Sequence, residues 1–236
     1  GNVDMKKYEE NKEKINLLYQ KYQQEGKIKN PRENVLVFHY PAKGVLHFNT
    51  TRIVGLNPTD PFQISQAERM AREQVMEMME FLQTEIPGFE NSCLLATAPA
   101  IGVRESRRID GEYLLTQEDL KNCTKFEDAI AAGNYDIDIH NPAGTGTSHY
   151  YFAPGTWYTI PYRSLQPKNI RNLLVGGRCL SATHEAQASI RIMPICCCTG
   201  QAAGTASAMA WATKTEVKNL NVKQLQQQLK QDGAFF

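Results

Sequence analysis

Residues 172–184, NLLVGGRCLSATH, and residues 193–212, MPICCCTGQAAGTASAMAWA, decide the fold of this chain. The apolar run at 173–175 predicts a buried strand, because strands covered on both faces are continuously apolar. Gly176 and Gly177 follow it, and glycines let a backbone lie close to a ligand where a Cβ would collide. Pro194 suits the first turn of a helix, since its missing N–H has no partner there. The stretch therefore predicts a strand, a tight loop and a helix.

Small residues recur every four positions along the predicted helix, at Gly200, Gly204, Ala208 and Ala212. They form a smooth ridge that a sheet or a bound dinucleotide can approach closely. The helix start adds N–H groups without intrahelical partners and the positive end of the helix dipole, which favour negative charge. We therefore expect a ligand where the glycine loop meets the helix.

The composition excludes several classes of protein. The 236 residues are enough for one large or two small domains. The 26 basic and 25 acidic residues give a net charge of +1 without a block of like charge, so neither nucleic acid nor a membrane surface is an expected partner. No apolar run approaches the roughly 18 residues of a membrane span, so a soluble protein is expected. Three adjacent cysteines at 196–198 favour a reducing, cytoplasmic location.

Residues 172–208 resemble the C-terminal flavin-contacting segment of the FAD-dependent oxidoreductase family, whose members read AGRCxSxTHxAxxSxRV before a small-residue helix. Earlier blocks resemble the same family in the same order, at 47–53 (HFNTTRI), 101–120 (IGVRESRRIDGEYLLTQEDL) and 158–174 (YTIPYRSLQPKNIRNLL). The resemblance implies an α/β to α+β fold of the two-dinucleotide-binding flavoprotein type. In such a fold a substrate-side sheet with helices accompanies the C-terminal strand-loop-helix of the FAD domain.

The G-x-G-x-x-G pattern that holds the FAD pyrophosphate in related folds does not occur in this chain. The nearest match is Gly144-Thr145-Gly146, with His149 where the third glycine belongs. The chain therefore resembles the C-terminal portion of a larger flavoprotein, and a dinucleotide-binding half is an expected partner. We expect three parts: an amphipathic helix at 1–30, a substrate-side sheet with helices at 31–165, and the C-terminal segment of the FAD domain at 166–236.

The resemblance implies a set of cofactor-binding residues around the glycine loop and the helix start. This set is Gly176, Gly177, Arg178, Ser181, Ala186, Arg191, Met193 and Gly200. The first three are expected beside the pyrophosphate or ribityl chain. The helix start is expected to stabilise negative charge on the reduced flavin.

Arg104, Arg107 and His184 are the candidate catalytic residues. Guanidinium groups bind carboxylates and phosphates through paired hydrogen bonds, so the two arginines suit an anionic substrate or the flavin pyrimidine. A surface salt-bridge cluster with Glu105 and Asp110 is the alternative interpretation. His184 follows the glycine loop, where an imidazole could contact the flavin or relay a proton.

No metal site is expected. The thiols of Cys196–Cys198 diverge by about 100° per residue on a helix, so they cannot converge on one ion. Asp136 and Asp138 alternate on a predicted strand, which is compatible with a cation site or with the carboxylate pair of a polysaccharide-acting enzyme. Alternating aspartates on a strand are usually solvated, however. Cys179 and His184 are too close in sequence to form a nucleophile–base pair easily.

Periodicity and turn residues predict the remaining elements. The expected elements are a helix over 5–25, a hairpin of strands 35–40 and 45–48, a helix capped at Ser65 and ending near 86, a strand over 93–100, helices from Thr116 and over 126–132, strands over 136–140 and 157–162, and a last helix capped by Asn221. The Gly/Pro-rich segment 141–155 is either a substrate lid or a plain surface loop.

The expected function is hydride transfer between a small organic substrate and FAD. The alternative is a non-catalytic binding module that has the flavoprotein fold and binds no FAD. Oligomeric state distinguishes them, because a flavoprotein half exposes an apolar face and tends to form homo-oligomers. A self-sufficient binding module is expected to be monomeric.

Overall fold

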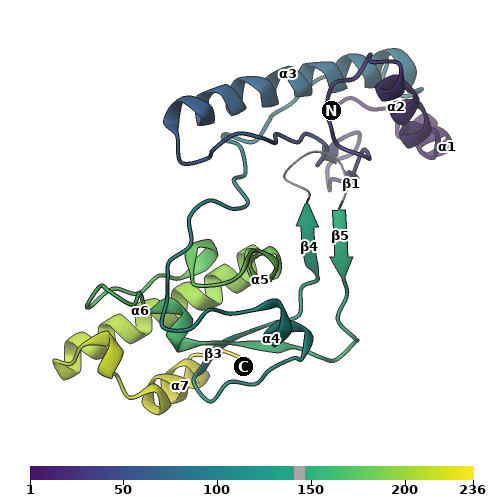
Figure 1. Cartoon of the computed structure of the whole chain (residues 1–236). Coiled ribbons are helices and arrows are strands. Elements are labelled where there is room, and N and C mark those ends of the chain that lie inside the picture. Colours follow the sequence, from purple (N-terminus) through teal and green to yellow (C-terminus); the bar gives the residue numbers. More distant parts are fainter. Residues whose placement is uncertain (141–146) are drawn as a thin grey trace. The chain divides into compact units, whose positions relative to one another are not determined.

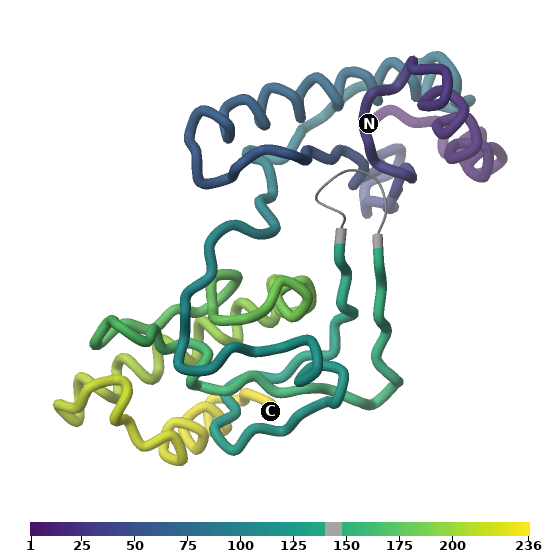
Figure 2. Tube along the Cα trace, viewed as in Figure 1, coloured from purple at the N-terminus to yellow at the C-terminus, as the bar shows by residue number. Residues whose placement is uncertain are grey.

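The computed structural model describes residues 1–140 and 147–236, which form two compact units (Figures 1 and 2). Unit 1 contains residues 1–103, and unit 2 contains residues 104–140 and 147–236. Each unit has a hydrophobic core of its own. Helices are mixed with small antiparallel sheets, in agreement with the predicted α/β to α+β class. The three-part division at residues 30 and 165 stays a prediction.

Unit 1 consists of helices packed beside one hairpin, drawn in purple and blue in Figure 1. Its elements are α1 (Met5–Asn11), α2 (Lys14–Gln24), β1 (Val37–His39), β2 (Leu46–Phe48) and α3 (Pro61–Glu85). The hairpin and the end of α2 before Gly26 are confirmed, but the single helix predicted over 5–25 is divided into α1 and α2. Tyr19 and Tyr22 of α2 contact Phe81 of α3 edge-on, with ring centroids 5.9 and 5.6 Å apart.

Helix α3 begins four residues before the predicted cap at Ser65. The Asp60 side chain accepts a hydrogen bond from the Phe62 N–H at 2.9 Å, and Pro61 occupies the first turn. The aspartate cap satisfies N–H groups of the first turn, and proline needs no partner there, so the helix starts before the chain reaches the capping box at Ser65. The predicted end is confirmed, because the helix stops at Glu85 before the sequence Ile86-Pro87-Gly88.

The strand predicted over 93–100 was wrong. This segment has no regular secondary structure and forms no ladder, and Leu94 and Leu95 are 47% and 63% exposed. A strand needs a neighbour to pair with, and β1 and β2 pair with each other. The segment is held on α3 instead, where Glu68 accepts the Ile101 N–H at 2.6 Å.

Unit 2, drawn in teal to yellow, contains two antiparallel hairpin-like sheets and four helices among its described residues (Figure 1). Its elements are α4 (Gln117–Lys121), β3 (Ala129–Gly133), β4 (Ile137–His140), β5 (Thr147–Tyr150), β6 (Tyr158–Pro161), α5 (His184–Ile190), α6 (Met193–Thr213) and α7 (Val222–Gln231). Three short 3-10 turns connect them, at Tyr162–Leu165, Gly177–Cys179 and Val217–Asn219. Strand β3 pairs with β6, β4 pairs with β5, and α6 packs on β3.

Strand β3 replaces the helix predicted over 126–132. Its small residues are buried between β6 and α6, and a Cβ added at Gly133 would come within 2.7 Å of the Ile195 side chain. The alanines favour a helix by intrinsic propensity, but close packing between a helix and a sheet also requires small residues. Packing in the tertiary structure therefore outweighs the local preference.

The prediction of a strand over 173–175 was also wrong. The Val175 N–H donates to the Leu165 carbonyl at 2.8 Å, but the segment joins no described sheet, and Leu173 is 39% exposed. The predicted helix is confirmed as α6, but the shorter α5 precedes it. The break has a direct cause, because Pro194 has no N–H to donate to the Ile190 carbonyl four residues earlier.

Four local predictions are confirmed in unit 2. Thr116 and Asp119 form a capping box at the start of α4, and Asn221 accepts hydrogen bonds from two N–H groups at the start of α7. The strands predicted over 136–140 and 157–162 correspond to β4 and β6. Of the predicted loop 141–155, residues 147–150 form β5, and residues 141–146 lie outside the described part of the chain.

None of the helices in the described residues combines the length and the apolar character that a membrane crossing requires.

The turn after α3 gives a test of the fold of unit 1. Gly88 has φ +102°, and a Cβ there would lie 2.8 Å from the Asp4 carbonyl oxygen and 2.9 Å from the Tyr8 nitrogen. We expect Gly88→Ala to lower the free energy of unfolding by about 2–4 kcal/mol, because backbone strain and overpacking add. Gly26→Ala is the control, since Gly26 has φ +71° but open space around it, and should cost only about 1 kcal/mol. Equal losses in denaturant titrations would show that the close contact is unimportant.

Candidate functional site

Side chains on one side of α5 meet the segment that begins unit 2. His184, Gln187 and Arg191 are three and four residues apart, a spacing that places them on the same side of a helix. The Gln187 side-chain amide donates to the carbonyl oxygen of Arg104 at 2.9 Å and holds this segment against the helix. Two of the three predicted catalytic residues, Arg104 and His184, are thereby brought to one place.

His184 is held by a carboxylate. Its Nδ1 lies 2.6 Å from Oε2 of Glu105, while Oε1 of Glu105 lies 3.1 Å from the guanidinium of Arg108. The His184 side chain is 40% exposed and begins α5, whose first turn is capped by the Thr183 hydroxyl. The ring is therefore fixed on one side and reaches the surface on the other.

Asp138 of β4 joins cations from two separate segments. Its Oδ2 lies 2.9 Å from Arg191 and 3.3 Å from Arg104, and its side chain is 8% exposed. The Arg191 side chain is 13% exposed. A buried carboxylate needs such partners, because a charge removed from water without compensation is very costly.

His149 of β5 completes the network from the neighbouring strand. Its Nδ1 lies 2.7 Å from Asp136, and its Nε2 lies 3.6 Å from Asp138. The ring stacks on Tyr151 with centroids 5.5 Å apart and planes 5° from parallel. Burial, followed by the charges of Asp136 and Asp138, raises the pKa of Tyr135 beside this cluster.

Sequence reasoning missed part of this network. It took Asp136 and Asp138 for solvated residues, which was wrong for Asp138, and it saw Glu105 only as a salt-bridge partner. The alternation of β4 gave no signal of this burial, since successive residues of a strand point to opposite faces and Asp138 is expected on the polar one. Arg107 is exposed and makes none of the contacts found in the described part of this network. Its catalytic role stays a prediction.

The glycine loop lies on the first turns of α6. A Cβ at Gly176 would come within 2.9 Å of the Thr199 carbonyl oxygen, and Gly177 has φ +76°. The Gly177 N–H donates to the Thr199 hydroxyl at 2.9 Å. Gly176 therefore serves the close contact of the loop with the helix, and Gly177 serves the left-handed turn of the loop. Gly200 differs, because a Cβ there would meet no atom within 4 Å.

A comparison with protein families gives one match. The sequence model of the family described as FAD dependent oxidoreductase matches residues 2–229. The chain belongs to this family. No curated protein and no solved structure matches it.

The start of α6 fits contact with the FAD of such an oxidoreductase. Ile192 precedes the helix without a side-chain cap, so N–H groups of the first turn remain for an acceptor. Met193 is 82% exposed, and open space lies beside Gly200 and Gly204. A flat ring or a chain of phosphates can approach such a surface closely. These residues fit one side of a cofactor site.

Other predicted cofactor residues lie deeper in the oxidoreductase. Ser181 and Ala186 are fully buried, and the Ser181 hydroxyl has no hydrogen-bond partner in the described part of the chain. A Cβ at Gly111 would come within 2.5 Å of the Ser181 Cβ, so this side chain faces Gly111. The side chain of Arg178 is exposed. The cofactor contacts of these residues stay predictions.

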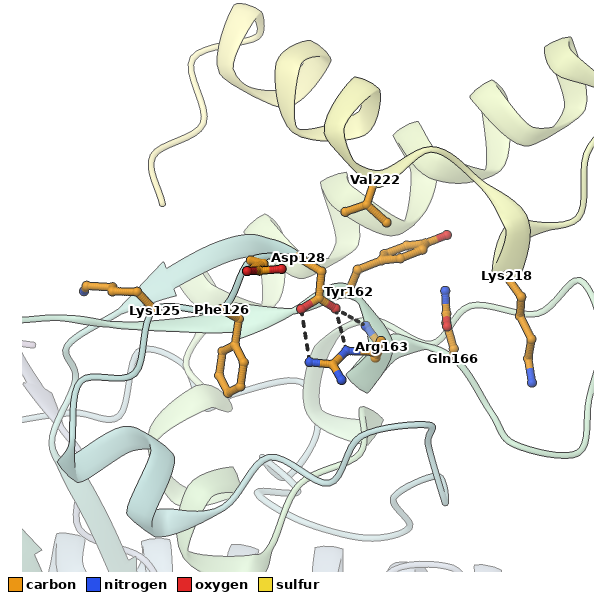
Figure 3. A pocket seen from close by; sticks show the side chains of 9 residues that line it. Lys125, Phe126, Asp128, Tyr162, Arg163, Gln166, Lys218 and Val222 are labelled. Carbon is orange, nitrogen blue, oxygen red and sulfur yellow. Dashed lines mark hydrogen bonds and ion pairs between the residues drawn. The ribbon is translucent and has the colours of Figure 1, made fainter.

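An open cavity of about 530 Å³ lies elsewhere in unit 2, near β3, β6 and α7. Figure 3 shows the ion pair of Asp128 and Arg163 within it. The Nε atom of Arg163 lies 3.0 Å from Oδ2 of Asp128. None of the predicted site residues lines this cavity. The described residues also contain no group of three or more His, Cys, Asp or Glu side chains that could hold a metal ion.

Asp138→Asn tests whether the network depends on this carboxylate. The substitution leaves the buried Arg191 without a formal counter-charge, so we expect a loss of about 3 kcal/mol in the free energy of unfolding. Asp110→Asn is the matched control, because the Asp110 side chain is 74% exposed and its one ion pair among the described contacts is with Lys168 at 2.7 Å. We expect this variant to lose less than about 1 kcal/mol in the free energy of unfolding. Similar losses for both variants in urea titrations would contradict the central role of Asp138.

Proposed function

We propose that this FAD-dependent oxidoreductase transfers hydride between a small organic substrate and FAD. We further propose that a dinucleotide-binding unit of the G-x-G-x-x-G type acts together with this chain. The single observation that carries the proposal is that α5 brings together two charged clusters, His184 with Glu105 and Arg191 with Asp138 and Arg104, just before the helix whose start fits the cofactor.

The start of α6 and the glycine loop would hold the cofactor. FAD, when bound, supplies the acceptor for hydride. The N–H groups of the first turn of α6 would stabilise negative charge on the flavin, because the helix fixes their direction and they would need no reorganisation. Arg178 would meet the ribityl or phosphate oxygens through its exposed guanidinium.

The charged network would bind the substrate and handle its proton. Arg104, whose side chain is 41% exposed, is held in position by Asp138 and by the contact of its carbonyl oxygen with Gln187. A guanidinium oriented in this way suits a carboxylate or another oxygen-rich group. His184 would accept or return the proton that accompanies hydride transfer. Both side chains reach the surface of unit 2, as substrate contact requires.

The exposed face of α6 supports a partner. Helix α6 has no continuous polar face, yet Met193 and Trp211 are 82% and 85% exposed. A helix without a polar face is normally covered on every side. We propose that the dinucleotide-binding unit or a second copy of the chain covers this face.

The first test is flavin content. We expect the protein expressed from its complete gene to copurify with FAD, visible as absorbance that dithionite bleaches. A flavin-free protein that stays colourless after addition of FAD would instead support the non-catalytic binding module.

Gly200→Leu tests the position of the cofactor. Because the space beside Gly200 is open, we expect the variant to fold normally and to weaken FAD binding at least about tenfold. Ala212→Leu is the control, since Ala212 is an exposed α6 residue about 18 Å further along the helix. Fluorescence titration with FAD measures both. Equal affinities would place the cofactor elsewhere.

A further inference from the structure

The hydrogen bond between His184 and Glu105 fixes more than the position of the ring. Nδ1 of His184 lies 2.6 Å from Oε2 of Glu105, a distance typical of a strong charge-assisted hydrogen bond. An ionised carboxylate has no proton to give, so the proton in this hydrogen bond belongs to Nδ1. In the neutral ring, Nε2 then carries a lone pair and no proton.

Two further contacts keep Glu105 in this role. Its second oxygen lies 3.1 Å from the guanidinium of Arg108, so the carboxylate is shared between a cation and the imidazole. The carbonyl oxygen of the preceding residue, Arg104, is held by Gln187 of the same helix that begins with His184. The carboxylate and the imidazole are therefore fixed to one element.

The neighbouring carboxylate of Glu185 makes a different contact. A hydrogen bond from its own backbone N–H is the main cause that holds the pKa of Glu185 below its ordinary value. That contact places it at the first turn of α5, where acidic residues satisfy N–H groups and the helix dipole. Glu105 is thus the carboxylate that faces Nδ1 of His184.

We infer that Glu105 is a positioning residue, which holds His184 in the Nδ1–H tautomer and directs Nε2 outward as a proton acceptor. This inference rests on the proposed function for its chemical meaning. FAD, when bound, would accept the hydride from the substrate carbon. Nε2 of His184 would accept the proton of the adjacent O–H or N–H group, so that a C=O or C=N bond could form with the substrate oxidised and the flavin reduced.

The tautomer can be measured in the chain without FAD. ¹⁵N NMR distinguishes a protonated from an unprotonated ring nitrogen, and the five histidines of the chain can be assigned with the help of His184→Gln. We expect wild-type His184 to carry its proton on Nδ1 at a pH where the ring is neutral. In Glu105→Ala we expect the ratio of the Nδ1–H to the Nε2–H form to fall about tenfold or more, as the loss of a hydrogen bond to a charged group predicts.

Glu112→Ala is the matched control. Glu112 is also a glutamate of unit 2 in an ion pair, but its partner is Lys218 and not a histidine. We expect this variant to leave the His184 signals at their wild-type positions. If Glu105→Ala does not fold, the wild-type spectrum decides, because a proton on Nε2 of neutral His184 overturns the inference.

An unchanged tautomer ratio in folded Glu105→Ala would overturn it as well. The result is separable from the test of the proposed function. A colourless protein with an Nδ1–H His184 refutes the flavoenzyme and leaves the positioning of the ring in place. A flavin-containing protein with an Nε2–H His184 refutes only the role of Glu105.

Discussion

The carboxylate of Asp138 is the charge on which the site in unit 2 depends. It is almost fully buried, and Arg191, Arg104 and His149 lie close enough to offset the cost of removing its charge from water. These partners come from the end of α5, from the first residue of unit 2 and from β5. One desolvated charge thereby links three segments that are distant in sequence. Replacing such a network by apolar residues often leaves a protein equally stable. We therefore attribute the network to the need to place polar groups at a functional surface.

Local signals in the sequence predicted much of the fold. The caps at Thr116 and Asn221, the hairpin of β1 and β2, and the start of α6 at Pro194 depend on neighbouring residues only, and all are confirmed. The errors at β3 and at residues 93–100 share another cause. Whether an apolar or alanine-rich run becomes a strand depends on a pairing partner, and the sequence of the run does not contain that partner.

The same distinction applies to the site. His184 and Arg104 were accessible from the sequence through their resemblance to a family motif. Asp138 and His149 were not, because their importance arises from the pairing of β4 with β5, which sets Asp138 opposite His149. Glu105 lies 79 residues from His184. No local pattern relates two such positions, and only the packing of the segment at 104–108 on α5 brings them together.

Pro194 gives the site its two helix starts. Without the interruption, residues 184–213 would form one helix, with a single set of N–H groups at His184. With it, α5 begins at His184 and α6 begins at Met193, nine residues later. One start carries the imidazole held by Glu105, and the other leaves N–H groups for an anionic ligand. In the proposed function, proton transfer and the stabilisation of flavin charge would fall to different groups, and a helix broken by proline would supply both from one short stretch of chain.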